Sequence, residues 1–171
     1  MNDSIKGPLA LTLICSAVCA LLAGANNLTA DRIRETENNR LQQALSEAFG
    51  DGQYEALSGK YEGVSQVISD GNGRLIFDII SNGYEKGSQH LLIGIAENAV
   101  TKVYPVSITD SPTQAAAVSE ASFLNQFAGW TDPDSEYDAV SGATRSSEGI
   151  RQAVARALRT YSENGELADY A

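Results

Sequence analysis

The first part of the chain is an unbroken apolar run followed by a helical pattern of apolar positions. Residues 7–25 carry no charged side chain, and a helix of that length is long enough to cross the core of a bilayer. Over residues 29–49, apolar side chains recur at the spacing of one helix face. The pattern predicts a transmembrane anchor over residues 1–28 that continues into a helical connector over residues 29–58.

A secretory signal peptide is the main alternative for the apolar run. Lys6 provides a basic flank, and Ala23-Gly24-Ala25 has the small-residue form of a cleavage site. The helical pattern that follows without a break favours a retained anchor. Basic residues flank both ends of the run in nearly equal number, so the sequence alone does not orient it.

Residues 59–171 predict a folded α+β domain that opens with an antiparallel sheet. Runs rich in β-branched residues alternate with short polar turns, which is typical of a meander. These runs cover residues 63–69, 75–81, 90–96 and 100–108. Pro105 lies inside the last run and cannot donate a backbone hydrogen bond, so we expect that strand at a sheet edge or at a bulge.

Two helices that flank the sheet are predicted after it, on either side of an acidic loop. Residues 113–129 are rich in alanine and carry apolar positions at helical spacing, and a glycine can end that helix. Residues 148–161 place apolar side chains on one face and three arginines on the other. Ser146 or Ser147 is available as the N-cap of this last helix.

The composition argues against several classes of function. The 171 residues include 12 basic and 22 acidic side chains, a formal net charge of −10, which argues against nucleic-acid binding. Cys15 and Cys19 both lie in the apolar run, and His90 is the single histidine, so we expect no iron–sulfur cluster or zinc site in the domain. The acidic loop over residues 131–138 lacks the glycine and the final glutamate of a calcium loop. No metal site is therefore predicted.

The stretch Asp138-Ala-Val-Ser-Gly-Ala-Thr144 stands directly before the last predicted helix. A helix N-terminus offers unpaired backbone N–H groups, and the small residues Gly142 and Ala143 would let a bulky group approach the backbone. Thr144 has no neighbouring base that could activate its hydroxyl as a nucleophile. By its residues alone, the stretch is either a turn suited to hold a phosphate or an ordinary helix start.

This stretch, followed by two serines and an apolar-periodic helix, resembles the flavinylation motif of the FMN-binding domain family. That family includes a flavin-bearing subunit of the Rnf electron-transport complex and a related, longer one of the sodium-pumping NADH:quinone oxidoreductase. The resemblance implies that FMN is joined to Thr144 by a phosphodiester, which a separate flavin transferase installs. It also implies that Ser141, Gly142 and Ala143 shape the turn and that Asp138 is a recognition or turn residue.

Other parts of the chain are similar to the flavin-bearing Rnf protein in the same order, and the short chain length also favours it over the quinone-reductase one. They are the apolar run leading into residues 26–30, Gly83-Tyr84 before an apolar strand, and Phe123-Leu124-x-x-Phe127 upstream of the motif. The loop over residues 110–115 keeps the acid, the hydroxyl of Ser111 and the proline of the family but lacks its glycines, so its contact with the flavin ring stays open. Tyr84 can stack on the flavin or pack on the sheet edge, and the sequence favours neither.

The resemblance implies an electron carrier without an acid–base site of its own. FMN on Thr144 would relay electrons within a membrane-bound, ion-translocating Rnf-like complex, a ferredoxin:NAD oxidoreductase, whose other subunits would be the partners. The family places the chain in the inner, cytoplasmic membrane, with the flavin domain on the extracytoplasmic side. Two alternatives stay open: a membrane-anchored binding or assembly module without a cofactor, and a subunit of a sodium-pumping quinone reductase. A reductase acting alone is disfavoured, because the sequence has no dinucleotide fingerprint.

Overall fold

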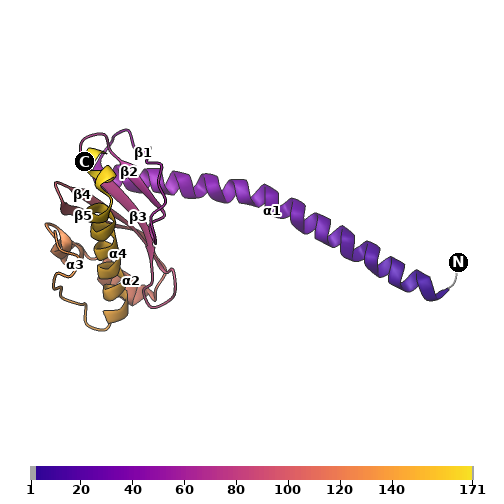
Figure 1. The fold of residues 1–171 in the computed structure, drawn as a ribbon. Helices are drawn as coiled ribbons and strands as arrows, with labels where there is room; N and C mark the ends of the chain where they lie inside the picture. Colours follow the sequence, from indigo (N-terminus) through magenta and orange to yellow (C-terminus); the bar gives the residue numbers. More distant parts are fainter. Residues whose placement is uncertain (1–2, 171) are drawn as a thin grey trace. The chain divides into compact units, whose positions relative to one another are not determined.

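The computed structural model describes the backbone of residues 3–170 and the side chains of residues 11–22, 24, 32, 35–167 and 170. The chain divides into two compact units, Met1–Gln42 and Gln43–Ala171. Helix α1 (Asp3–Phe49) makes up the described part of the first unit, and its last residues belong to the second (Figure 1).

The first unit corrects the predicted membrane anchor. No helix among the described residues is long and apolar enough to cross a bilayer. Within the predicted span, the described side chains are those of residues 11–22 and 24, and the other side chains of the predicted anchor lie outside the described residues. The predicted transmembrane anchor and the predicted single-pass location in the inner membrane are therefore contradicted. The helix itself runs through residue 28 without a break.

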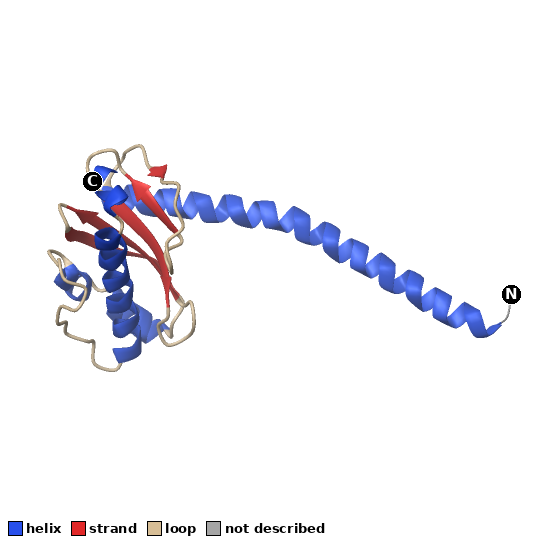
Figure 2. Cartoon of the chain, in the orientation of Figure 1, coloured by secondary structure: helices blue, strands red, loops and turns tan. Residues whose placement is uncertain are grey.

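The second unit is built on a five-stranded antiparallel meander (Figure 2). The strands lie in the sheet in chain order: β1 (Glu55–Ala56), β2 (Gln66–Ser69), β3 (Leu75–Ser81), β4 (Gln89–Ala96) and β5 (Ala99–Ile108). The predicted antiparallel sheet and α+β class are confirmed. The sequence does not reveal β1, because two exposed residues leave no periodic pattern.

Single residues explain two details of the sheet. Glu97 and Asn98 join β4 to β5 with φ values of 51° and 62°, as a tight hairpin turn with two left-handed residues requires. Pro105 lies in β5 at the sheet edge, and the register shifts between Leu91, its partner, and His90. The expectation of an edge strand or bulge at this proline is confirmed, because the missing N–H is tolerated there.

Helix α4 (Thr144–Glu163) covers one face of the sheet and forms the main core with it (Figure 1). Ile150, Val154 and Leu158 on its apolar face belong to the same buried cluster as Phe77 of β3 and Ile93 of β4. The predicted amphipathic helix is confirmed, and it begins four residues earlier than its apolar pattern indicated. A short helix, η2 (Gly165–Tyr170), follows it.

The helix predicted over residues 113–129 is divided into three pieces. They are α2 (Pro112–Ser119), α3 (Ala121–Leu124) and η1 (Asn125–Phe127). Glu120 between α2 and α3 is extended, with φ −60° and ψ 133°, and so interrupts the helical hydrogen bonds. The break lets Phe123 and Phe127 enter the core, where their ring centroids lie 5.4 Å apart edge to face. Tertiary packing therefore overrides the local helical pattern.

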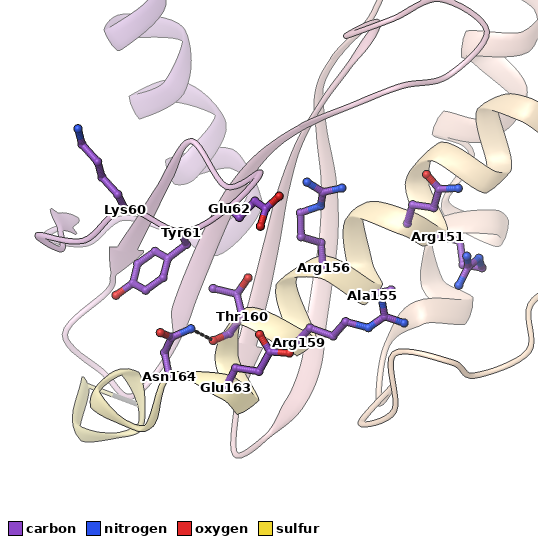
Figure 3. Close-up of a pocket in the computed structure, with 11 residues that line it drawn as sticks. Lys60, Tyr61, Glu62, Arg151, Ala155, Arg156, Arg159, Thr160, Glu163 and Asn164 are labelled. Carbon is purple, nitrogen blue, oxygen red and sulfur yellow. Dashed lines mark hydrogen bonds between the residues drawn. The ribbon is translucent and has the colours of Figure 1, made fainter.

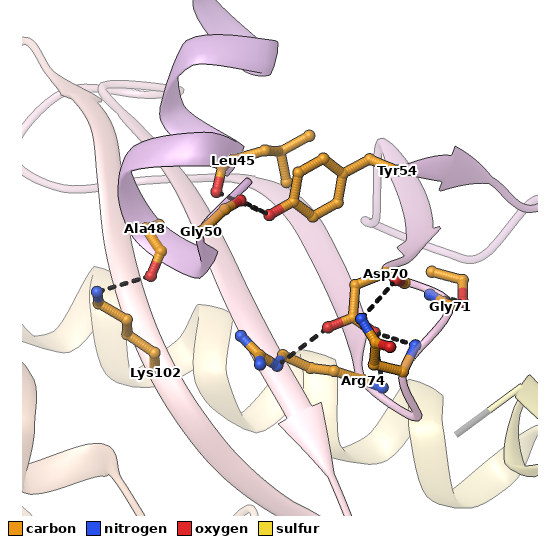
Figure 4. A network of polar contacts seen from close by, with 10 residues as sticks. Leu45, Ala48, Gly50, Tyr54, Asp70, Gly71, Arg74 and Lys102 are labelled. Carbon is orange, nitrogen blue, oxygen red and sulfur yellow. Dashed lines mark hydrogen bonds and ion pairs between the residues drawn. The ribbon is translucent and has the colours of Figure 1, made fainter. Parts of the chain in front are cut away.

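The C-terminal end of α1 packs against the opposite face of the sheet (Figure 4). Leu45 and Ala48 are buried, and the Lys102 ammonium donates to the Ala48 carbonyl at 2.7 Å. Side chains alternate along a strand, and Val103 belongs to the core beneath α4, so Lys102 lies on the other face. The Tyr54 hydroxyl donates to the Leu45 carbonyl and further fixes the helix end. Helices therefore protect both faces of the central strands.

Candidate functional site

The motif identified in the sequence lies where α4 begins. Thr144 is the first residue of α4 and is exposed, with the buried Ala143 as N-cap. Gly142 has a φ of +78°, a conformation that glycine adopts at little cost, and no atom lies within 4 Å of where its Cβ would be. The turn thus leaves Thr144 accessible at the positive end of the helix dipole.

The first turn of α4 leaves several hydrogen-bond donors free. Within the described part of the chain, the N–H groups of Thr144, Arg145 and Ser146 have no acceptor, and the Thr144 hydroxyl has no partner. The first bond of the helix runs from the Ser147 N–H to the Ala143 carbonyl at 2.9 Å. An anion with several acceptor oxygens fits this donor set.

Neither Ser146 nor Ser147 is the N-cap of α4, although we expected one of them to be. Both Ser146 and Ser147 lie inside the first turn of α4 and are buried. The Ser147 hydroxyl donates to the Ala143 carbonyl at 3.0 Å and accepts from the Val140 N–H at 3.0 Å. Ser147 therefore ties the motif turn to the helix, and the motif is held in shape from inside.

A shallow hollow of about 390 Å³ opens beside Thr144. Its lining residues come from the turn after β3 and from α4: Asn82, Gly83, Thr144, Arg145, Glu148, Gly149 and Gln152. Tyr84 follows directly on this lining and is 60% exposed, and its ring centroid lies 5.9 Å from the Arg145 guanidinium carbon. Tyr84 is therefore not packed into the sheet, and the fold brings it to the Thr144 site.

Of the seven predicted site residues, Thr144 lines this hollow, and the other six, which include Asp138 and Ser111, do not. The side chain of Asp138 is exposed, and its backbone N–H donates to the side-chain oxygen of Gln126 at 2.8 Å. Ser111 is the exposed N-cap of α2, and its side chain forms no capping hydrogen bond. Helix α2 nevertheless reaches the motif through Gln114, whose side-chain nitrogen donates to the Gly142 carbonyl at 3.3 Å.

A buried aspartate that is not among the predicted site residues lies next to the hollow. Asp110 is 7% exposed, and its carboxylate accepts the Ser146 hydroxyl at 2.6 Å and the Tyr84 N–H at 2.9 Å. It also accepts from the side-chain nitrogen of Gln89 at 3.2 Å. In the sequence, an aspartate between a strand and Ser-Pro is typical of an exposed turn. Only the folded chain shows that it joins three segments.

The Asp110 carboxylate stays ionised despite its burial. Burial raises the pKa of Asp110, but hydrogen bonds from Ser146, Ser88, Gln89 and the Tyr84 N–H together outweigh it, so the pKa lies below the ordinary value. The cluster therefore holds a negative charge beside the first turn of α4.

Glu148, which lines the hollow, is also held in its ionised form. Hydrogen bonds from Arg151, at 2.7 and 3.0 Å, are the main reason that the pKa of Glu148 is lowered to about 2. The Tyr137 hydroxyl donates to the same carboxylate at 2.8 Å. Burial, and then this hydrogen bond to Glu148, raises the pKa of Tyr137 to about 12.

The Glu148 network predicts a defined loss of stability in acid. The pKa of Glu148 is lower in the folded chain than the value of about 4.3 for an unfolded glutamate. The stabilisation that comes from its ionised form is therefore fully present above that pH. It is lost as the pH falls toward about 2. In Glu148→Gln, the free energy of unfolding should depend less steeply on pH in this window, measured by urea unfolding at several pH values. Glu136→Gln, which removes an exposed charge from the neighbouring loop, serves as the control. An unchanged pH dependence in Glu148→Gln would contradict the network.

A larger groove of about 610 Å³ runs along α4 (Figure 3). Its cationic lining residues are Lys60, Arg151, Arg156 and Arg159. Two of these arginines already form ion pairs, and Glu62 and Glu163 add negative charge to the lining. The charges are balanced, and neither Thr144 nor any other residue of the motif lines this groove.

The region that contains this site matches a known family. Residues 83–159 match the family model described as the FMN-binding domain. This range begins at the glycine of the turn after β3 and includes Tyr84, Asp110 and Thr144. No curated protein matches the chain significantly. Through residues 83–159, the chain is therefore similar to the FMN-binding domain family.

Proposed function

We propose that this chain is an electron carrier that holds FMN covalently on Thr144. The match of residues 83–159 to the FMN-binding domain model supports a flavin-binding role, and FMN supplies one-electron and two-electron redox chemistry when it is bound. The observation that carries the covalent link is the exposed Thr144 hydroxyl at the start of a 20-residue helix, beside three free N–H groups within the described region.

The donor set around Thr144 suits a phosphodiester. A phosphodiester keeps one negative charge, and the helix N-terminus, the free N–H groups and the Arg145 guanidinium all favour that charge. Gly142 and Ala143 keep large side chains away from the backbone at this point. The residues present therefore fit the phosphate end of FMN.

The same geometry supports modification by a separate enzyme. Among the described residues, the Thr144 hydroxyl has no hydrogen-bonded base that could take its proton. The phosphate of FMN has no good leaving group, so the donor must be a flavin dinucleotide such as FAD. The Thr144 oxygen bonds to the FMN phosphorus, the pyrophosphate bond breaks, AMP leaves, and a flavin transferase accepts the hydroxyl proton.

We place this carrier in an Rnf-like electron-transport complex, with other proteins of the complex as its electron donor and acceptor. The support is the resemblance to the flavin-bearing Rnf protein, whose features recur in order along the chain. Co-purification of the tagged chain with its electron-transfer partners from its native cells tests this assignment. Recovery of the chain without any redox partner would contradict it.

The covalent link has a direct test. The purified chain is incubated with a flavin transferase and FAD, denatured, separated on a gel and examined for flavin fluorescence. We expect a fluorescent band, and peptide mass spectrometry should place the mass of FMN less one water on Thr144. A colourless band, with Thr144 unmodified, would instead support a module without covalent flavin.

A further inference from the structure

The buried cluster around Asp110 takes no part in forming the phosphodiester, yet it joins the segments that border the Thr144 hollow. Asp110 follows the end of β5, Tyr84 lies in the turn after β3, and Ser146 lies in the first turn of α4. The carboxylate accepts one hydrogen bond from each of the other two segments. One side chain therefore links both walls of the hollow.

On the basis of the proposed function, we infer that Asp110 is a positioning residue of the flavin site: it fixes the turn that carries Tyr84 against the helix start that carries Thr144. It does not touch Thr144 and acts through Ser146, two residues further along α4. Nothing in its place in the sequence assigns this role.

The surrounding contacts make the link stiff. Gln89 donates to the Ser146 carbonyl at 2.9 Å as well as to Asp110, and it accepts from the Ser81 hydroxyl at 3.0 Å. A Cβ on Gly83 would lie 2.2 Å from a carboxylate oxygen of Asp110, so the turn approaches the carboxylate as closely as glycine permits. Because the polar groups of this cluster are hydrogen-bonded and closely packed, its side chains have few alternative conformations.

The role requires a carboxylate and not merely a polar side chain. Asp110 is surrounded by donors, and an ionised carboxylate is an acceptor at both oxygens. In Asp110→Asn, one oxygen can still accept from Tyr84, but the new NH₂ group would face the Gln89 nitrogen. The link to α4 would weaken while the overall volume of the side chain stays the same.

Asp78 provides a matched control. It is 5% exposed, faces away from the α4 core, accepts from the Gln66 side chain at 3.0 Å and pairs with His90 at 2.7 Å. Asp78→Asn therefore disturbs a buried carboxylate of similar burial without touching the Thr144 site. Any effect of general destabilisation should appear in both variants.

The test measures kcat and KM of a flavin transferase acting on each variant with FAD, at a temperature where circular dichroism shows the variants folded. We expect Asp110→Asn to lower kcat by about 10-fold to 100-fold, because a small misplacement of a reacting group has effects of this size. Asp78→Asn should leave kcat unchanged. If Asp110→Asn proves unstable, Ser146→Ala removes one of the same hydrogen bonds, and its kcat should also fall.

A second readout needs no flavin. In the unmodified chain, the amide resonance of Tyr84 should shift as Asp110 gains its proton on acidification, and Asp110→Asn should lack that shift. Equal kcat values in wild type and Asp110→Asn, or an equal loss in Asp78→Asn, would overturn the positioning role. If the wild-type chain itself is not labelled with flavin, the proposed function fails. The positioning role is then tested by the resonance alone: it is overturned if the Tyr84 amide shifts on acidification in Asp110→Asn as it does in wild type.

Discussion

Thr144→Ala is expected to abolish covalent flavin attachment completely. The variant removes the hydroxyl oxygen at the first position of α4, which is the atom to which the phosphorus would bond. Replacing an exposed threonine with alanine at this position removes no described hydrogen bond, so the fold should stay intact. Flavin fluorescence of the denatured band, normalised to protein, measures the effect.

Two variants make this result specific. Thr144→Ser keeps a hydroxyl at the same place and should still be labelled. Thr113→Ala removes an exposed threonine from α2 and should leave labelling unchanged. A labelled alanine variant at position 144 would move the link to another residue, and the labelled peptide would identify it.

Gly149→Ala is expected to cause the largest loss of stability among single substitutions at the site. A Cβ at this position would lie 2.2 Å from the backbone oxygen of Asn82 and 2.6 Å from a side-chain oxygen of Gln89. Because a backbone atom cannot turn away as a side chain can, α4 and the turn after β3 must separate. Overpacking of this kind costs about 1 to 3 kcal/mol or more, which exceeds the gain of about 1 kcal/mol from alanine in a helix.

Urea unfolding followed by circular dichroism measures this loss. Gly165→Ala is the matched control, because no atom lies within 4 Å of its added Cβ, and it should unfold near the wild-type midpoint. Asn82 lines the hollow beside Thr144, so Gly149→Ala should also be labelled more slowly with flavin than the control. A Gly149→Ala variant as stable as wild type would show that the turn can shift without strain.

Local patterns predicted most of the sheet and the last helix. Leu75–Ser81 matches β3 at both ends, because its β-branched run is bounded by polar turns, and Pro105 indicated the edge position of β5. The residues of α4 were recognised by their period, but its first residue was not, because Ser146 and Ser147 look like caps while their side chains are buried. The break at Glu120 was not predicted, because it too depends on burial. Burying the aromatic side chains that follow it stabilises the fold more than a continuous helix would.

The sequence by itself determined the motif from Asp138 to Thr144, the antiparallel sheet before it and the amphipathic helix after it, because these depend on residue order and on periods of two and 3.6 residues. Only the tertiary structure decided which residues meet at the site. It brought Tyr84 to Arg145 and buried Asp110 between two segments, while it left Ser111 apart. These contacts join residues as many as 61 positions apart, as in the Tyr84–Arg145 pair, and no local pattern encodes them. They arise because the sheet and α4 bury their apolar faces together, and that packing fixes the neighbours of every polar group at their edge.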